Sequence, residues 1–268
     1  MPNKHHAKIG IIGGTGMYDS NFFKYSKRVK VDTPYGETSD LVSLGDCFGT
    51  PIAFIPRHGR KHTIPPHKIN SRANIWALKE LGVTRILSPS VVGSLRKELR
   101  PGDIVVSDQF IDFTRQRDYT YYDNGQICHI SMADPFCPEL RQIAIQRIKN
   151  LLNYDVHSKG TYLCVEGPRF STRAESLFFK DVLSADVIGM TLVPECVLAR
   201  EAQLCYVSIA MITDYDVWSD SPVSTKAVLE ILKMNVERTK KIVTDLASNI
   251  PPKRNICDCS RALDGALI

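Results

Sequence analysis

Short apolar runs alternate along this chain with segments of helical periodicity, and this alternation restricts the fold more than any other feature. Strand-like runs occur at residues 8–12, 41–44, 52–55, 83–87, 104–107, 161–165, 187–190 and 205–212. Helical spacing of apolar residues occurs at 71–81, 140–152, 193–204 and 224–247. Strands that alternate with helices predict a parallel sheet covered by helices. We therefore expect an α/β fold with a twisted, mixed, mostly parallel sheet.

The whole chain is expected to form one domain. Its 268 residues are enough for one large α/β domain, and its prolines and glycines are scattered rather than collected in a linker. No internal repeat interrupts the pattern. We expect a single domain over 1–268, with an N-terminal extension at 1–7 and a C-terminal tail from about residue 249.

Charge and hydropathy exclude several classes of protein. The net charge of +5 is small, and Lys and Arg are spread along the chain rather than gathered in the stripe typical of nucleic-acid binders. No apolar run approaches the length of a membrane span, and the first residues lack the apolar core of a secretion signal. We expect a soluble cytoplasmic protein with neither a nucleic-acid nor a membrane partner.

Eight cysteines are present, and Cys257-Asp258-Cys259 is the closely spaced pair among them. Paired Cys-x-x-Cys ligands are absent, so neither structural zinc nor any other metal is expected. Thiols of cytosolic proteins normally stay reduced, with intracellular proteins of hyperthermophiles as the exception. Most of the cysteines are therefore expected to be reduced, and the disulfide state of Cys137, Cys205, Cys257 and Cys259 stays open. A disulfide is the less favoured alternative, with Cys257/Cys259 as its strongest candidate.

Polar clusters follow the predicted strands. They lie at residues 13–16, 56–58, 88–90, 190–191 and 214–216. In open α/β sheets, ligands bind beyond the carboxyl ends of the strands. We expect these clusters to meet at one binding site.

Two of these clusters have the chemistry of an anion site. The turn Gly13-Gly14-Thr15-Gly16 can surround an anion with backbone N–H groups, and the Thr15 hydroxyl adds a donor. A tight turn that needs positive φ is the alternative. Arg57 offers a rigid fork that fits phosphate oxygens, and His58 can supply another donor. Alone, this pair would be a basic surface turn.

Two other clusters could bind an aromatic ligand. In Glu166–Ser171, Phe170 could stack on a purine face or instead fill the core. Asp214 and Asp216 could face one ligand from a turn after a strand. Crowding of like charges would raise the pKa of one carboxyl group, so that it holds a proton near neutral pH and serves as a general acid. A solvated acidic turn is the alternative.

Together these segments resemble the methylthioadenosine phosphorylase branch of the purine nucleoside phosphorylase family. The matching stretches include IGIIGGTG, PRHGRKHTIPPHKIN, EGPRFSTRAES, VIGMT and TDYD, and the resemblance extends from about Lys8 to about Val243. It implies a nucleoside phosphorylase-like fold in a homotrimer or a homohexamer. It also implies that 5′-methylthioadenosine and inorganic phosphate, as co-substrate, react to give adenine and 5-methylthioribose 1-phosphate. No metal or organic cofactor is implied.

The resemblance also assigns site residues. For phosphate these are Thr15, Arg57, His58, Ser90, Val91 and Thr191. For the nucleoside they are Met190 at the ribose, Phe170 and Ser171 beside the purine, Asp214 and Asp216 opposite the base, and His129 and His62 near the ribose 5′ end. His129 would come from a neighbouring subunit. Ser171 and Thr225 would bear on specificity.

The aspartates favour a 6-aminopurine. A carboxylate accepts a hydrogen bond from the 6-amino group, and a carboxylic acid donates a proton to N7 as the glycosidic bond breaks. We expect Asp214 to be this acid, because it matches the family's acidic pair. The expected transition state has oxocarbenium character at C1′.

Three alternatives compete with this hypothesis. A broader purine nucleoside phosphorylase would act on adenosine or inosine. A dinucleotide-dependent oxidoreductase would explain the glycine turn, but Gly16 is followed by Met-Tyr-Asp-Ser-Asn rather than by an apolar helix. A non-catalytic nucleoside sensor would not need both Arg57-His58 and the paired aspartates.

Overall fold

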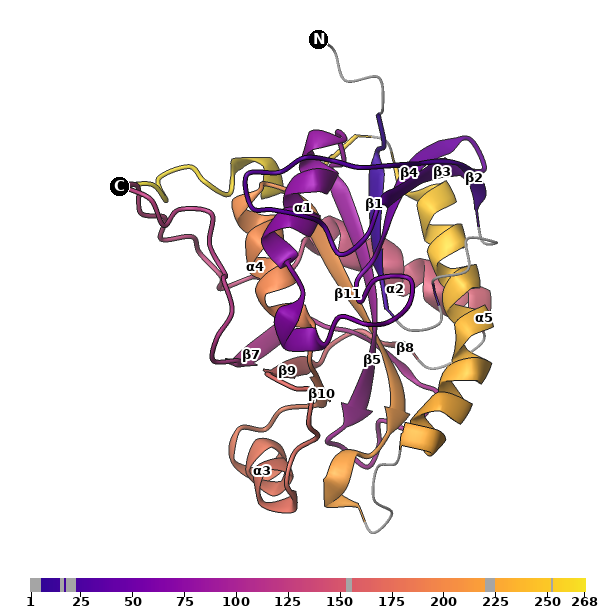
Figure 1. Cartoon of the computed structure of the whole chain (residues 1–268). Coiled ribbons are helices and arrows are strands. Elements are labelled where there is room, and N and C mark those ends of the chain that lie inside the picture. The colour runs from indigo at the N-terminus through magenta and orange to yellow at the C-terminus, as the bar shows by residue number, and fades with distance from the viewer. Residues whose placement is uncertain (1–5, 15–16, 18–22, 153–155, 220–224, 252) are drawn as a thin grey trace.

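The computed structural model describes residues 6–14, 17, 23–152, 156–219, 225–251 and 253–268, of which residues 152 and 225–234 are described by their backbone alone. Within these residues, eleven strands form one mixed sheet (Figure 1). They are β1 (Ile9–Gly13), β2 (Lys24–Val29), β3 (Val42–Cys47), β4 (Thr50–Pro56), β5 (Arg85–Ser94), β6 (Ile104–Val106), β7 (Gln109–Phe113), β8 (Val156–His157), β9 (Thr161–Val165), β10 (Val187–Gly189) and β11 (Cys205–Asp214). The α/β fold and the mixed, mostly parallel sheet are confirmed.

Strand β5 is the centre of the sheet. The main path runs β2-β3-β4-β1-β5-β10-β9-β7, and β11, β6 and β8 branch from β5. Strands β1 and β11 are parallel to β5, whereas β10 is antiparallel to it and parallel to β9. The carboxyl ends of strands that run in opposite directions therefore meet at one place.

Helices cover both faces of the sheet (Figure 1). The four long ones are α1 (Ser71–Glu80), α2 (Pro138–Leu152), α4 (Leu192–Glu201) and α5 (Thr225–Asn249). Buried residues of α1 and α4, such as Ile75 and Leu198, share one core cluster. Buried residues of α2 and α5, such as Leu140 and Leu246, share the other. None of the described helices combines the length and apolar character that a membrane crossing requires.

All eight strands and four helices expected from the sequence occur, with shifted ends. Strands β2, β7 and β8 were not predicted. β2 and β7 are the two ends of the sheet path, and their residues are largely exposed or half-buried. β8 has only two residues. Edge strands carry no continuous apolar run, so a pattern of burial cannot reveal them.

Strands β5 and β11 run further than the apolar pattern predicts. They stay paired from Arg85 and Cys205 as far as Gly93 and Asp214, with a register shift between Ile212 and Asp214. Ser90 and Asp214 therefore lie within strands rather than in loops after them, which corrects the prediction. A shift of this kind changes the direction of a side chain at the end of a strand.

The short helix α3 (Arg173–Leu177) begins just before the part of the chain that leads to β10. Its cap is Thr172, whose hydroxyl accepts from the Glu175 N–H at 3.1 Å while the Glu175 carboxylate accepts from the Thr172 N–H at 2.7 Å. This reciprocal arrangement is a capping box. The preceding residue, Ser171, lies outside this capping box and lines the cavity described below.

Replacing Gly189 by alanine is expected to destabilise the fold by about 1–3 kcal/mol or more. A Cβ at Gly189 would lie 1.9 Å from Oη of Tyr162, which is fully buried. Urea unfolding of Gly189→Ala measures the loss. Gly125→Ala is the control, because its Cβ meets nothing within 4 Å although its φ is +91°. Equal losses of stability in Gly189→Ala and Gly125→Ala would show that the close contact with Tyr162 is not what makes alanine unfavourable at position 189.

Candidate active site

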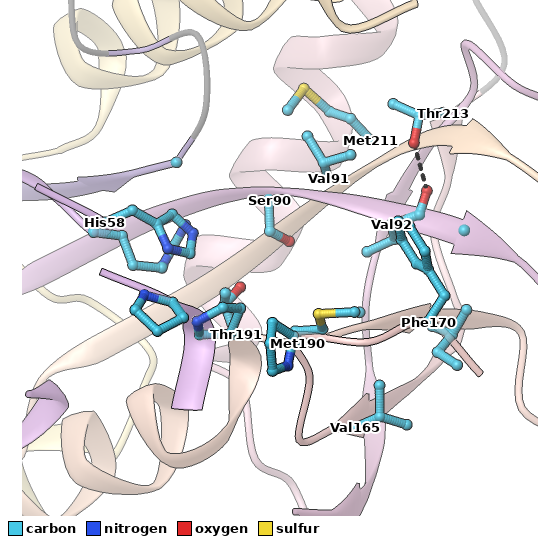
Figure 2. Close-up of a pocket in the computed structure, with 18 of the residues that line it drawn as sticks. His58, Ser90, Val91, Val92, Val165, Phe170, Met190, Thr191, Met211 and Thr213 are labelled. Carbon is cyan, nitrogen blue, oxygen red and sulfur yellow. Dashed lines mark hydrogen bonds between the residues drawn. The ribbon is translucent and has the colours of Figure 1, made fainter. Parts of the chain in front are cut away.

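A cavity of about 640 Å³ opens where strands β1, β4, β5, β9, β10 and β11 end. This volume lies in the ordinary range of small-molecule sites. Figure 2 shows His58 toward one end of it, Phe170 and Thr213 toward the other, and Ser90 between them. The residues that were predicted for the site and that line the cavity are Arg57, His58, His62, Ser90, Val91, Phe170, Ser171, Met190, Thr191, Asp214 and Asp216.

Three predicted residues do not line this cavity in the described structure. Thr15 lies outside the described residues, and Thr225 begins α5 with a side chain that is not described. His129 lies away from the cavity, beside the C-terminal segment, where its N–H donates to the Ala266 carbonyl at 2.8 Å. The roles assigned to these three residues stay predictions.

The glycine turn reaches the cavity through Gly14. Neither Gly13 nor Gly14 has a positive φ, so these two residues do not support the alternative of a tight turn that only glycine can form. A Cβ on Gly14 would lie 3.2 Å from Nη1 of Arg57. A side chain at position 14 would therefore crowd the Nη1 end of the guanidinium group.

Arg57 is buried and bound to a partner that the sequence did not reveal. Its Nε and Nη2 donate to the two carboxylate oxygens of Glu195, at 2.8 and 3.0 Å. Burial alone would lower the pKa of Arg57, but the Glu195 carboxylate outweighs burial and raises it. Arg57 is thus not part of a basic surface turn, and the paired Nε and Nη2 donors of its guanidinium group face Glu195 instead of a ligand.

One guanidinium nitrogen remains for a ligand. Nη1 carries two hydrogens, and among the described residues its acceptor is the Pro89 carbonyl at 3.2 Å. Glu195 is held in turn by the hydroxyl groups of Ser88 and Tyr206, each donating to Oε1 at 2.6 Å. The expected two-pronged contact with phosphate is therefore not open to Nε and Nη2, and Nη1 is the guanidinium nitrogen that could donate to an anion.

His58 is neutral near pH 7 because its surroundings oppose a charge. Burial, and then the Arg57 charge, lower its pKa to about 4. Nδ1 lies 2.9 Å from the Ile64 carbonyl, which can only accept, so Nδ1 carries the proton. Nε2 is then a bare acceptor. In this state the His58 ring cannot donate through Nε2 as predicted, because Nε2 can only accept a hydrogen bond, and a contact between His58 and phosphate stays a prediction.

Asp214 and Asp216 lie together at the other end of the cavity. The Asp214 carboxylate accepts from the Thr213 hydroxyl and from the Asp216 N–H, both at 2.8 Å. Asp216 is buried and accepts from the Ser176 hydroxyl. This is not a solvated acidic turn. Thr213 and Ser176 were missed because a hydroxyl beside an apolar run gives no signal of its own.

The pKa of both aspartates is raised, but the main cause differs from the expected one. Burial is the largest influence on each carboxyl group. Hydrogen bonds from Thr213 and the Asp216 N–H partly lower the pKa of Asp214. The charge of Asp214 raises the pKa of Asp216 less than burial does. Desolvation, rather than crowding of like charges, therefore favours a retained proton.

Raised carboxyl pKa values in the folded state mean that stability falls as pH rises. Below about pH 4 the groups are protonated in both states, and above it the unfolded chain ionises first. The free energy of unfolding should decrease as the pH rises from about 4 through the raised pKa values of the folded state. This decrease should be smaller in Asp216→Asn, which has one of these carboxyl groups fewer. Urea unfolding across this pH range tests the difference, with exposed Asp32→Asn as the control. An unchanged pH slope in Asp216→Asn would refute it.

Arg117, which the sequence did not indicate, organises the wall between the two ends. It donates to the carbonyls of Met190 at 2.8 Å and Glu166 at 2.7 Å, and its Nε contacts the Glu166 carboxylate at 3.1 Å. Glu166 therefore serves Arg117 rather than the cavity. Phe170 is 45% exposed and lines the cavity, so it does not fill the core.

Known proteins match this chain over nearly its whole length. A family model described as the Phosphorylase superfamily matches residues 8–248. S-methyl-5′-thioadenosine phosphorylases from Nitrosopumilus maritimus and Thermofilum pendens are 58% and 55% identical, covering 97% of this chain and 97% and 98% of their own.

Solved structures give the same result. A methylthioadenosine phosphorylase from an antarctic soil metagenomic library has a TM-score of 0.93 at 42% identity, covering 99% of this chain and 93% of its own. The methylthioadenosine phosphorylase of Schistosoma mansoni in complex with adenine has a TM-score of 0.87 at 40% identity, covering 92% and 93%. The chain therefore belongs to the phosphorylase superfamily, among the S-methyl-5′-thioadenosine phosphorylases.

Proposed function

We propose that this chain catalyses the phosphorolysis of 5′-methylthioadenosine to adenine and 5-methylthioribose 1-phosphate. The observation that carries the proposal is a single cavity lined by hydrogen-bonding groups for an anion at one end and by two aspartates at the other. The near-full-length similarity to S-methyl-5′-thioadenosine phosphorylases supports the same reaction. Inorganic phosphate is the second substrate, and the proposal includes no metal or organic cofactor.

Phosphate would bind at the Arg57 end. Nη1 of Arg57 and the hydroxyl groups of Ser90 and Thr191 supply donors, and Val91 adds backbone to the same wall. The backbone N–H of His58 has no acceptor among the described residues and offers one more donor. Thr15 would complete the site. Donors fixed in place before the reaction stabilise charge without reorganisation.

The purine would bind at the aspartate end. Phe170 and Ser171 border it, and Met190 lies where the ribose would connect the two ends. As the C1′–N9 bond breaks, its electron pair passes to the purine and Asp214 gives a proton to N7. A phosphate oxygen forms the new bond to C1′ from the opposite face. Positioning and electrostatics supply the rate, with no covalent enzyme intermediate.

The specificity for the 5′ group would depend on association of subunits. His62 lines the cavity, whereas His129 of the same chain does not. We propose that His129 of a neighbouring copy approaches the ribose 5′ end in a homotrimer or homohexamer. Ser171 and Thr225 would tune the preference. We also propose that the chain acts as one domain in the cytoplasm.

Adenosine is a second candidate substrate. The related Schistosoma mansoni protein is described as an adenosine/methylthioadenosine phosphorylase. Two aspartates at the base end favour a 6-amino group over a 6-oxo group, because a carboxylate can only accept while ionised. Inosine should therefore be the poorer substrate.

Adenine release from 5′-methylthioadenosine, measured with and without inorganic phosphate, tests the proposal. We expect release that requires phosphate, with adenosine slower and inosine slowest. Release at equal rates in both conditions would indicate a hydrolase and reject phosphorolysis. Binding of the nucleoside without release in either condition would indicate a sensor.

A further inference from the structure

Four cysteines form a compact cluster far from the cavity. Sγ atoms of Cys137, Cys205, Cys257 and Cys259 all lie within 4.8 Å of one another, and all four cysteines are free thiols. Three of them are at most 5% exposed, and Cys257 is partly buried. None of the four lines the active-site cavity.

The cluster joins three distant segments of the chain. Cys137 directly precedes α2, Cys205 is the first residue of β11, and Cys257 and Cys259 belong to the C-terminal tail. Figure 1 shows the tail crossing the edge of the sheet at which β5 and β11 begin. Asp214 is at the opposite end of β11, a distance of roughly 30 Å along a ten-residue strand.

We propose that these four cysteines form a structural zinc site. Tetrahedral zinc with Zn–S bonds of about 2.3 Å separates its sulfur ligands by about 3.8 Å. The measured separation of Cys205 and Cys257 Sγ atoms is 3.5 Å, and the whole set fits within the 4.8 Å limit. Four cysteine thiolates are the ligand set of a closed structural zinc site, and zinc binding involves no change of oxidation state.

Backbone N–H groups donate hydrogen bonds to sulfur atoms of the cluster. The Leu140 N–H donates to Sγ of Cys137 at 3.4 Å, at the N-terminus of α2 where the helix dipole stabilises negative charge. The Cys259 N–H makes a further hydrogen bond to Cys257. Each thiol that binds the metal releases its proton, and the step needs no oxidant.

The neighbouring framework holds the ligands in place before a metal binds. Glu139 accepts from the N–H groups of Asn255 and Ile256 at 3.0 and 3.1 Å, which fixes the tail just before Cys257. Arg85 contacts the other oxygen of Glu139 at 2.8 Å, and it pairs with Cys205 across the sheet. Such supporting contacts orient metal ligands. Bound zinc would tie the tail to α2 and β11.

Metal analysis of the protein purified without chelators tests the proposal. We expect about one zinc per chain in the wild-type protein. The zinc content of Cys257→Ser and Cys259→Ser should be lower by about fivefold or more. Cys47→Ser and Cys128→Ser are matched controls outside the cluster, and they should keep the zinc. Stoichiometric iron, no metal, or unchanged zinc in Cys257→Ser would overturn the proposal.

A thiol count distinguishes zinc from disulfides even if a variant fails to fold. The unreduced protein, denatured with a chelator, should expose all eight cysteines as reactive thiols. Four or six thiols would mean that the cluster is oxidised, and would overturn the proposal. Substitution with cobalt(II) should give the intense visible absorption of a tetrahedral thiolate site. Removal of the metal should lower the midpoint of thermal unfolding. It should leave the active-site cavity unchanged, because the cluster lies far from it.

Discussion

Asp214→Ala is expected to lower kcat for phosphorolysis of 5′-methylthioadenosine by about 10²–10⁴-fold, the usual contribution of a general acid. The carboxyl group lies in the cavity and is desolvated, which raises its pKa and favours the protonated form that can donate to N7. Steady-state kinetics at saturating phosphate measures the loss. Phe170→Leu should have a much smaller effect, because it changes contact area and no proton transfer.

A leaving group that needs no proton provides the control for Asp214. A 7-methylpurine nucleoside already carries positive charge on its base, so Asp214→Ala should retain far more of its activity on that substrate. Equal, small losses in Asp214→Ala and Phe170→Leu would reject the acid role. Equal, large losses on both kinds of leaving group would assign Asp214 to binding instead.

Glu195→Ala is expected to cost about 3–5 kcal/mol of stability, because it leaves a buried charge without its partner. Arg57 is 1% exposed and depends on Glu195 for contacts to Nε and Nη2. Ser88 and Tyr206 would lose their acceptor as well. Urea unfolding measures the loss. Glu237→Ala is the control, since its side chain is 71% exposed and its ion pair with Lys240 should contribute little.

A double variant separates stability from function. Arg57→Met with Glu195→Ala removes both charges and should recover much of the stability lost in the single variant. It should not recover turnover, because Nη1 of Arg57 is absent. If Glu195→Ala unfolds within about 1 kcal/mol of the wild type, the buried ion pair does not have the proposed importance.

The strands and helices that could be predicted are those whose burial requires a recognisable pattern of apolar residues in the sequence. Strands such as β1 and β11 are apolar and lie next to the central strand β5, so their runs were visible. The polar clusters at their ends were expected to converge because parallel strands end at one edge. Edge strands β2 and β7 were missed for lack of such a pattern.

The contacts between side chains could not be predicted. Nothing local marks Glu195, within a mostly buried helix, as the partner of Arg57. The protonation state of His58 depends on the Ile64 carbonyl and on burial, which only the folded chain defines. The four cysteines are separated by up to 122 residues, from Cys137 to Cys259, so spacing gave no sign of a common site.

The bare Nε2 of His58 has a consequence for the choice between oxyanions. Near neutral pH, phosphate retains a hydroxyl hydrogen that Nε2 can accept, whereas sulfate has none and would place a lone pair against a lone pair. Glu195 already balances the charge of Arg57, so this end of the cavity would not attract the ion through a net positive charge. Phosphate would then be preferred over sulfate because Nε2 accepts the hydroxyl hydrogen of phosphate and repels an oxygen of the fully deprotonated sulfate.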